Sequence, residues 1–195
     1  MDKTATLFME HLADEKRACG LRVTSKDAEL TTLWKVIHYV LLILSLGQMN
    51  RFYDGFTTTI GKTVYYPAEW RVKHADTYDI VTLRHEGRHV RQFIKWGLGN
   101  ATLGIFVMGL FYLFLPLPMG LAWFRYMFER AAYKVSYYTM LELGLKPDIE
   151  HYIRQMIGPN YLWAWPFERA VRGWFLVNCH PAKLPKHRSS VPPPA

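Results

Sequence analysis

The segment from Asp76 to Gly97 reads DTYDIVTLRHEGRHVRQFIKWG. Its apolar residues recur at helical spacing, which gives the segment one apolar face. Asp76 is a typical N-cap, Asp79 stands where a capping box places its second residue, and Gly97 is a typical stop. The sequence therefore predicts a helix over residues 76–96 that packs against a core through Ile80, Val81, Leu83, Val90, Phe93 and Ile94.

Within this helix lies the string His85-Glu86-Gly87-Arg88-His89. Positions four apart share one helix face, so both imidazoles can reach a single cation. Glu86, beside the first ligand, can contact a water molecule and act as general base. Random placement in a chain of this composition gives about 0.015 occurrences of the pattern. We expect a Zn²⁺ site with His85 and His89 as ligands; the alternative is a pair of packing histidines beside a solvated Glu86.

A zinc site of this kind needs a third protein ligand from elsewhere in the chain. The string Phe128-Glu129-Arg130-Ala131-Ala132-Tyr133 offers Glu129 on a later apolar helix, with Ala132 three positions beyond it. Residues 60–133 resemble the gluzincin metallopeptidases, in which a later Glu completes the two-His site. They are most similar to small bacterial proteins of uncharacterised function that carry the same motif, a Gln matching Gln92, and a later Phe-Glu-Arg-x-Ala-Tyr.

The resemblance implies a zinc metallopeptidase, with a peptide or protein as substrate and Glu129 as the third metal ligand. Many such peptidases have an Asp four residues after this Glu, where this chain has Tyr133. The partner of one histidine is therefore open between Asp76, Asp79 and a backbone carbonyl. Competing third ligands are Glu168 in the similar string Pro166-Phe167-Glu168-Arg169-Ala170, and also Glu142, His151 and His180.

Hydrolysis also requires a donor for the developing oxyanion. Tyr133 is the first candidate, and the alternatives are Tyr137, Arg130 or a tyrosine of the predicted hairpin. That hairpin joins Thr57–Ile60 to Thr63–Pro67 through Gly61-Lys62, and Pro67 indicates an edge strand or a strand end. We expect the strand around Thr63–Tyr66 to pair with an extended peptide.

The rest of the chain predicts an α+β fold that is predominantly helical, with a zincin-like metal helix, a small hairpin or sheet and a long apolar helical hairpin. We expect a helix over 3–19 ending at Gly20, and a second helix capped by Ser25 that becomes a buried core helix over Val36–Asn50. Further helices are expected over 119–143 and 148–157. The expected regions are N-terminal helices (1–50), a metallopeptidase-like core (51–145), a Trp-rich C-terminal segment (146–180) and a Pro-rich tail (181–195).

Composition and charge narrow the classes of function. The net charge of +8 comes without a long basic run or a nucleic-acid-binding motif, so a nucleic acid partner is not expected. The 2 cysteines cannot form a disulfide framework. The first twelve residues lack the apolar run of a signal peptide, which leaves a cytoplasmic, membrane-associated or virion location open.

Ala101 to Phe124 contains no charged residue, and Pro116 and Pro118 interrupt it. Such a stretch fits two broken core helices or a hairpin in contact with a membrane. Two further functions remain open beside peptide hydrolysis. One is a non-catalytic scaffold with a peptidase-like fold in a larger assembly, such as a membrane complex or a virus particle, and the other is hydrolysis of a lipid or another ester.

Overall fold

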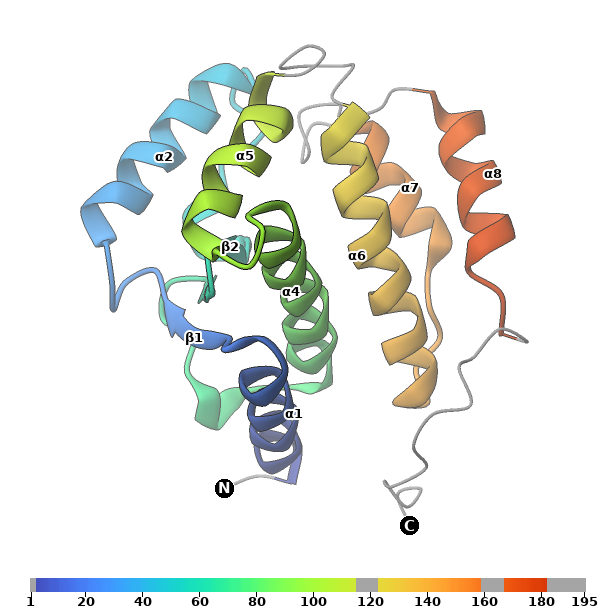
Figure 1. Ribbon diagram of the computed structural model, residues 1–195, viewed down its shortest axis with the longest axis horizontal. Coiled ribbons are helices and arrows are strands. Elements are labelled where there is room, and N and C mark those ends of the chain that lie inside the picture. Colours follow the sequence, from blue (N-terminus) through green and yellow to red (C-terminus); the bar gives the residue numbers. More distant parts are fainter. Residues whose placement is uncertain (1–2, 115–122, 159–166, 182–195) are drawn as a thin grey trace.

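The computed structural model describes residues 3–114, 123–158 and 167–181 (Figure 1). The described chain is mostly helical and carries one small sheet, as the sequence predicts. Its elements, in chain order, are α1 (Lys3–Cys19), β1 (Arg22–Ser25), α2 (Thr31–Leu44), α3 (Phe52–Gly55), β2 (Thr58–Ile60), β3 (Thr63–Tyr66), a 3₁₀ turn (Val72–His74), α4 (Thr77–Trp96), α5 (Ala101–Phe114), α6 (Trp123–Glu142), α7 (Ile149–Ile157) and α8 (Glu168–Asn178).

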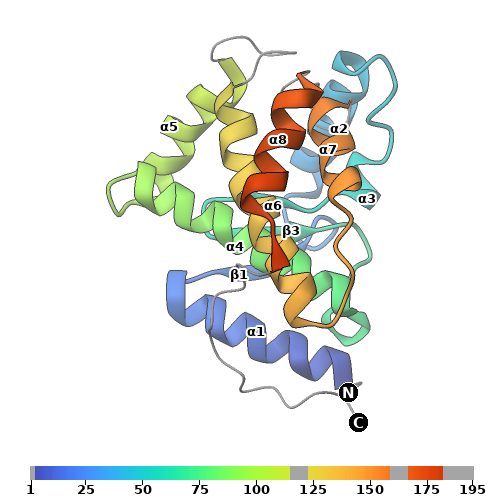
Figure 2. The same ribbon diagram turned by 90° about the vertical axis from the view of Figure 1, so that its right-hand side faces the viewer.

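Helix α4 is the centre of the molecule, with α1, α5 and α6 packed around it (Figures 1 and 2). The predicted capping box is present at its start. The backbone N–H of Asp79 donates to Asp76 over 2.9 Å, and the backbone N–H of Asp76 donates to the Asp79 carboxylate over 3.0 Å. Gly97 follows the last helical residue. The sequence prediction for this helix is therefore confirmed at both ends.

The predicted hairpin is also confirmed, but it belongs to a three-stranded sheet of order β1-β3-β2. Strand β1 pairs in parallel with β3, and β2 pairs antiparallel with β3. Ser25 therefore ends a strand opposite Tyr66 and does not cap a helix, so that expectation was wrong. Because β1 covers the far side of β3, the edge strand of this hairpin is β2, and Pro67 marks only the end of a strand.

Helix α2 corrects the expectation of a buried core helix over Val36–Asn50. It ends at Leu44, and its outer face is exposed to solvent. Its inner face is anchored by the fully buried Trp34, whose ring lies 4.7 Å from that of Tyr65 and 6.3 Å from that of Phe52 between centroids. The outward side of α2 is apolar, and no part of the described chain covers it.

Two hydrophobic cores hold the metal-motif helix in place. One joins α1, β3 and α4, because Phe8 packs with Tyr66, Ile80 and Leu83. The other packs α6 against α7 and α8 through a cluster of tyrosines with Ile153, Met156, Val171 and Phe175. The first helix thus shares a core with the sheet and with α4.

The stretch from Ala101 to Phe124 forms α5 and the start of α6, while its two prolines lie outside the described residues. Among the helices that the structure describes, none has the length and apolar character needed to cross a membrane. Helix α6 ends before Gly144 and the short helix α7 follows, in agreement with the sequence. Of the Trp-rich segment, α8 is described, and the tail from residue 182 lies outside the described residues.

Candidate metal centre

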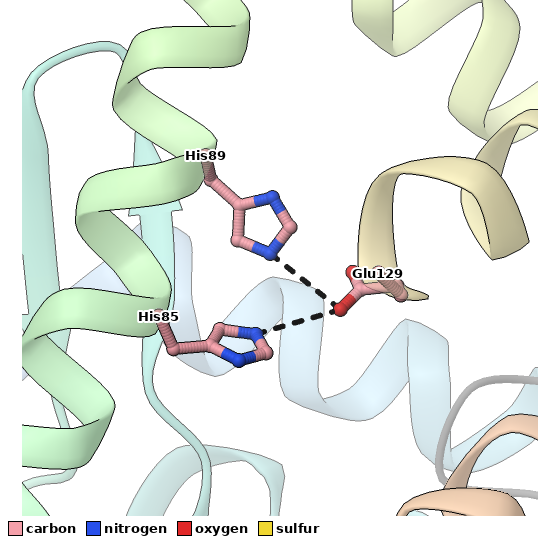
Figure 3. Close-up of side chains that lie close together, drawn as sticks. All are labelled: His85, His89 and Glu129. Atoms are coloured by element: carbon pink, nitrogen blue, oxygen red, sulfur yellow. Dashed lines mark ion pairs between the residues drawn. The ribbon is translucent and has the colours of Figure 1, made fainter. Parts of the chain in front are cut away.

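The three residues that the sequence selects as metal ligands lie together (Figure 3). His85 and His89 on α4 face Glu129 on α6, and all three side chains are buried. The Nε2 atoms of the two histidines lie 3.6 Å and 3.5 Å from Oε2 of Glu129. These distances exceed the usual hydrogen-bond range. They are close to the spacing of about 3.3 Å between ligand atoms around a tetrahedral metal with bonds of about 2.0–2.1 Å. The group could therefore hold one metal ion.

Helix geometry and the packing of α4 against α6 bring the ligands together. The two histidines lie one turn apart on α4, and Glu129 projects from α6 between the buried Phe128 and Ala132. Gly87, within the motif, makes room for α1, since a Cβ at this position would meet the carboxylate of Glu15. The motif thus carries ligands toward α6 and a packing contact toward α1.

Each histidine is oriented by a hydrogen bond through Nδ1. Nδ1 of His85 lies 3.0 Å from Oγ of Ser136, and Nδ1 of His89 lies 2.8 Å from Oε1 of Gln92. Gln92 in turn donates from Nε2 to the carbonyl of Phe128 over 3.1 Å. With Nδ1 protonated and donating, Nε2 of each ring carries the lone pair that a cation needs.

This arrangement settles the histidine partners that the sequence left open. Asp76 and Asp79 form the cap at the start of α4 and are not partners of the histidines. Gln92 lies three residues after His89, and Ser136 lies on the Glu129 face of α6. Helical spacing from Glu129 could have indicated Ser136, because positions seven apart share a face.

Electrostatics favour an ion pair between protonated His89 and ionised Glu129, so a cation that binds here would displace the proton on Nε2 of His89. Burial disfavours protonation of His89, but Glu129 outweighs burial and raises the pKa of His89 to about 9. Burial also disfavours ionisation of Glu129, but the two histidines hold the pKa of that carboxyl well below its usual range. A carboxylate kept ionised in a buried site is the form that a divalent cation requires.

Glu86 lies beside the ligands without belonging to the group. Its Oε2 accepts a hydrogen bond of 2.6 Å from the hydroxyl of Thr59 on β2. Thr59 was expected only as a strand residue, and nothing in its sequence context indicates this contact. The edge strand thus fixes the orientation of the carboxylate next to the group of His85, His89 and Glu129.

Two cavities meet at this carboxylate. The first has a volume of about 430 Å³ and mostly apolar walls, and the second has a volume of about 570 Å³ and a larger share of polar walls. Both are bordered by His85, Glu86, Phe56 and Thr57. The candidate site is therefore accessible from two sides that differ in character.

Among the proposed oxyanion donors, Tyr133 contacts one of the three candidate ligands directly. Its ring contacts that of His85 edge to face, with centroids 4.9 Å apart, and it borders the second cavity. Arg130 instead packs over aromatic rings, with its guanidinium carbon 5.0 Å from the centroid of Trp174. Tyr137 packs in the core between α6 and α8, and Tyr66 donates to the backbone of Asp79.

The competing third ligands lie outside the group of three. Glu168 pairs with Arg172 at the start of α8, and Glu142 pairs with Arg84. His151 borders the second cavity, while His180 is exposed after the end of α8. One further residue that sequence reasoning missed is Arg125, a buried arginine that lines the first cavity, one turn before Glu129 on α6.

Comparison with known proteins gives no relative for this chain: no family model, curated protein or solved structure matches it.

Proposed function

We propose that the chain is a zinc-dependent hydrolase that cleaves peptide bonds, as its resemblance to gluzincin metallopeptidases implies. The observation that carries the proposal is the buried group of His85, His89 and Glu129, with the carboxylate of Glu86 beside it and outside it. Two imidazoles and one carboxylate form a donor set that suits catalytic zinc, because the fourth position stays open.

His85, His89 and Glu129 would hold the ion. Zinc in such a site activates water and polarises the carbonyl of a bound substrate. Ser136 and Gln92 keep the two rings in the tautomer that offers Nε2 to the ion. The mostly apolar wall of the first cavity lowers the local dielectric constant, which strengthens these interactions.

Glu86 is assigned the role of general base. Its carboxylate takes a proton from the attacking water and later delivers that proton to the leaving amine. The hydroxyl of Thr59 holds one carboxylate oxygen, which limits rotation of the side chain. Tyr133 is assigned as donor to the developing oxyanion, because its ring lies against His85 and borders a cavity.

Strand β2 is the element that we assign to binding an extended peptide. It forms the edge of the sheet, and Thr58, Thr59 and Ile60 line the first cavity beside the metal-binding group. Backbone groups at a sheet edge pair with an added strand. The proposed peptide site thus moves from β3, where the sequence placed it, to β2.

The test compares the native protein with Glu86→Gln and with Glu142→Gln, which alters an ion pair on α6. Zinc content and cleavage of a random peptide library are measured for each protein. We expect bound zinc in all three and cleavage only by the native protein and Glu142→Gln. Equal cleavage by the Glu86→Gln protein would remove the assigned base and contradict the proposal.

A further inference from the structure

We infer that the preferred substrate has a bulky apolar residue on one side of the cleaved peptide bond and polar residues on the other. This inference rests on the proposed function and names the class of peptide. Its basis is the position of Glu86 and His85, which border both an apolar and a more polar cavity. A chain bound across the metal-binding group would place its two sides in different surroundings.

The first cavity is lined by residues of five helices (α2, α3, α4, α5 and α6) and of β2. Helices α2 and α3 contribute large apolar side chains, α4 contributes Phe93, and α5 contributes Ile105, Met108 and Gly109. Its volume of about 430 Å³ is within the range of roughly 300–1,000 Å³ that small ligands occupy. Apart from Arg125, the charged lining belongs to the metal-binding group and Glu86. Such walls favour an aromatic or branched aliphatic side chain.

The second cavity has a mixed lining: about half of its wall is apolar, with Phe56, Val81, Met140 and Tyr152 among its residues, and the other half is polar. Lys146, Asp148, His151 and Gln155 line it together with Thr82, and they come from α4, α7 and the segment before α7. These groups exchange hydrogen bonds with water or with a polar ligand. Because the first cavity offers far fewer such groups, we expect the polar side of the substrate in the second cavity.

Gly109 gives a direct way to fill the first cavity. It lines the cavity, and a Cβ built on it meets no atom within 4 Å. A Gly109→Leu side chain would enter space that the substrate needs. Gly173 on α8 is a matched control, since a Cβ there also meets no atom within 4 Å and the residue lines neither cavity. Both substitutions replace glycine in a helix by a better helix former.

The experiment measures binding to zinc-loaded Glu86→Gln protein, which binds peptides without cutting them. Two labelled peptides differ only in a Phe or a Ser at one position beside the expected cleavage site, and fluorescence anisotropy gives their affinities. We expect the Phe peptide to bind roughly 10- to 100-fold more tightly. Adding Gly109→Leu should abolish this preference, and adding Gly173→Leu should keep it.

Equal binding of the two peptides, no binding of either, or a preference that survives Gly109→Leu would overturn the inference. Cleavage that depends on Glu86 but ignores the apolar residue would leave the proposed function intact and remove only the substrate class. If the Phe peptide binds preferentially but the native protein does not cleave it, the preference for an apolar residue would stand and the proposed function would be contradicted.

A second inference concerns the surface of the two helices that wall the first cavity. Outward-facing residues of α2 and α5 are apolar and exposed, among them Tyr39, Ile43, Leu103 and Phe106. We propose that this α2–α5 surface docks on an anionic membrane. Both helices line the first cavity; Figure 1 shows them in the upper left of the molecule, and Figure 2 shows them at opposite edges of that view.

Backbone conformation at the helix ends supports this docking surface. Helices α2, α4 and α6 end with the same pair of backbone hydrogen bonds, and the residue after the C-cap takes the left-handed conformation; at α2 and α4 the glycine that follows it, Gly47 or Gly99, also has positive φ. At α6 the residue after the C-cap is Gly144, but at α2 and α4 it is Leu46 and Leu98. These two side chains are 86% and 91% exposed. The left-handed conformation is unfavourable for a leucine, and neither of these two leucines is buried in the fold. Contact with another apolar phase would explain why leucine occupies both positions.

Charge identifies the phase as an anionic lipid surface. No Asp or Glu occurs from Thr31 to Tyr53 or from Gly87 to Phe128, although these segments contain Lys35, Arg51 and Lys95. Cations without carboxylates attract a surface of anionic lipids, and exposed leucine and aromatic side chains enter its boundary.

The test is cosedimentation of the full chain with vesicles of phosphatidylcholine, with and without phosphatidylserine. Replacing Leu46 and Leu98 by glycine should raise the melting temperature, because glycine accepts the left-handed conformation, and should weaken vesicle binding roughly tenfold or more. Leu176→Ser on α8 is the control and should leave binding unchanged. Absent vesicle binding, binding without need for phosphatidylserine, or a dimer that the double glycine variant dissociates would overturn the docking proposal.

Discussion

Gln92 and Ser136 position the two histidines, and each can be removed without touching a ligand. Gln92→Ala and Ser136→Ala should each weaken zinc binding by about 10- to 100-fold, since the rings lose the partner that fixes their tautomer. Gln48→Ala, at an exposed position beyond α2, should have no effect. Competition titration against a chelator measures the affinities. Unchanged zinc affinity in both variants would show that packing alone orients the rings.

A substitution at Thr59 distinguishes the positioning of Glu86 from metal binding. Thr59→Val keeps the shape of the side chain but removes the hydroxyl that donates to Glu86. We expect kcat for peptide cleavage to fall roughly tenfold, with KM and zinc content unchanged, because only the base loses its orientation. Thr24→Val on β1, at a residue that lines neither cavity, serves as the control. A loss of zinc in Thr59→Val would assign the threonine to the metal centre instead.

The sequence identified His85, Glu86, His89 and Glu129 because each belongs to a local string with a chemical meaning. It missed Thr59 and left Ser136 unassigned, since contacts between residues far apart in the chain depend on how the elements pack. Gln92 was identified through a motif, and the structure adds its bond to the backbone of α6.

At the level of elements, the buried Lys26 holds α3 in place by hydrogen bonds to backbone carbonyls at its two ends. Nζ of Lys26 donates to the carbonyls of Phe52 and Phe56 over 2.6 Å and 2.7 Å. Burial lowers the pKa of Lys26 from 10.5 to about 7. Phe52 and Phe56 both line the first cavity, so this contact shapes the wall of the candidate site.

The lowered pKa makes stability depend on pH. Between pH 7 and 10 the unfolded chain binds a proton at Lys26 that the folded chain has released, so the free energy of unfolding rises with pH. The rise should be on the order of a few kcal/mol. Lys26→Met should lack this rise. Urea unfolding of the metal-free proteins at several pH values measures it, and parallel profiles would refute the assignment.

The elements also show which parts of the fold local sequence determines. The capping box of α4 and the Gly61-Lys62 turn are read from a few adjacent residues, and both are confirmed. Strand β1 was not predicted because its partner β3 lies about forty residues later and pairs in parallel. The missed strand also caused the wrong choice of edge strand, since β1 makes β3 central.

For the whole molecule, a metal ion would link α4 to α6 and thereby join the two hydrophobic cores. A ligand that binds only the folded state stabilises it, by about 2.7 kcal/mol at one hundred times its dissociation constant. Zinc should therefore raise the melting temperature of the native protein and leave that of Glu129→Gln nearly unchanged. Equal stabilisation of both proteins in differential scanning calorimetry would place the ion elsewhere.

The most direct test of the metal centre is calorimetric titration of zinc into the metal-free native protein, Glu129→Gln and Glu168→Gln. We expect one tightly bound ion per chain in the native protein and in Glu168→Gln, and a large loss of affinity in Glu129→Gln. Absence of binding by the native protein, or equally tight binding by Glu129→Gln, would contradict a site formed by His85, His89 and Glu129.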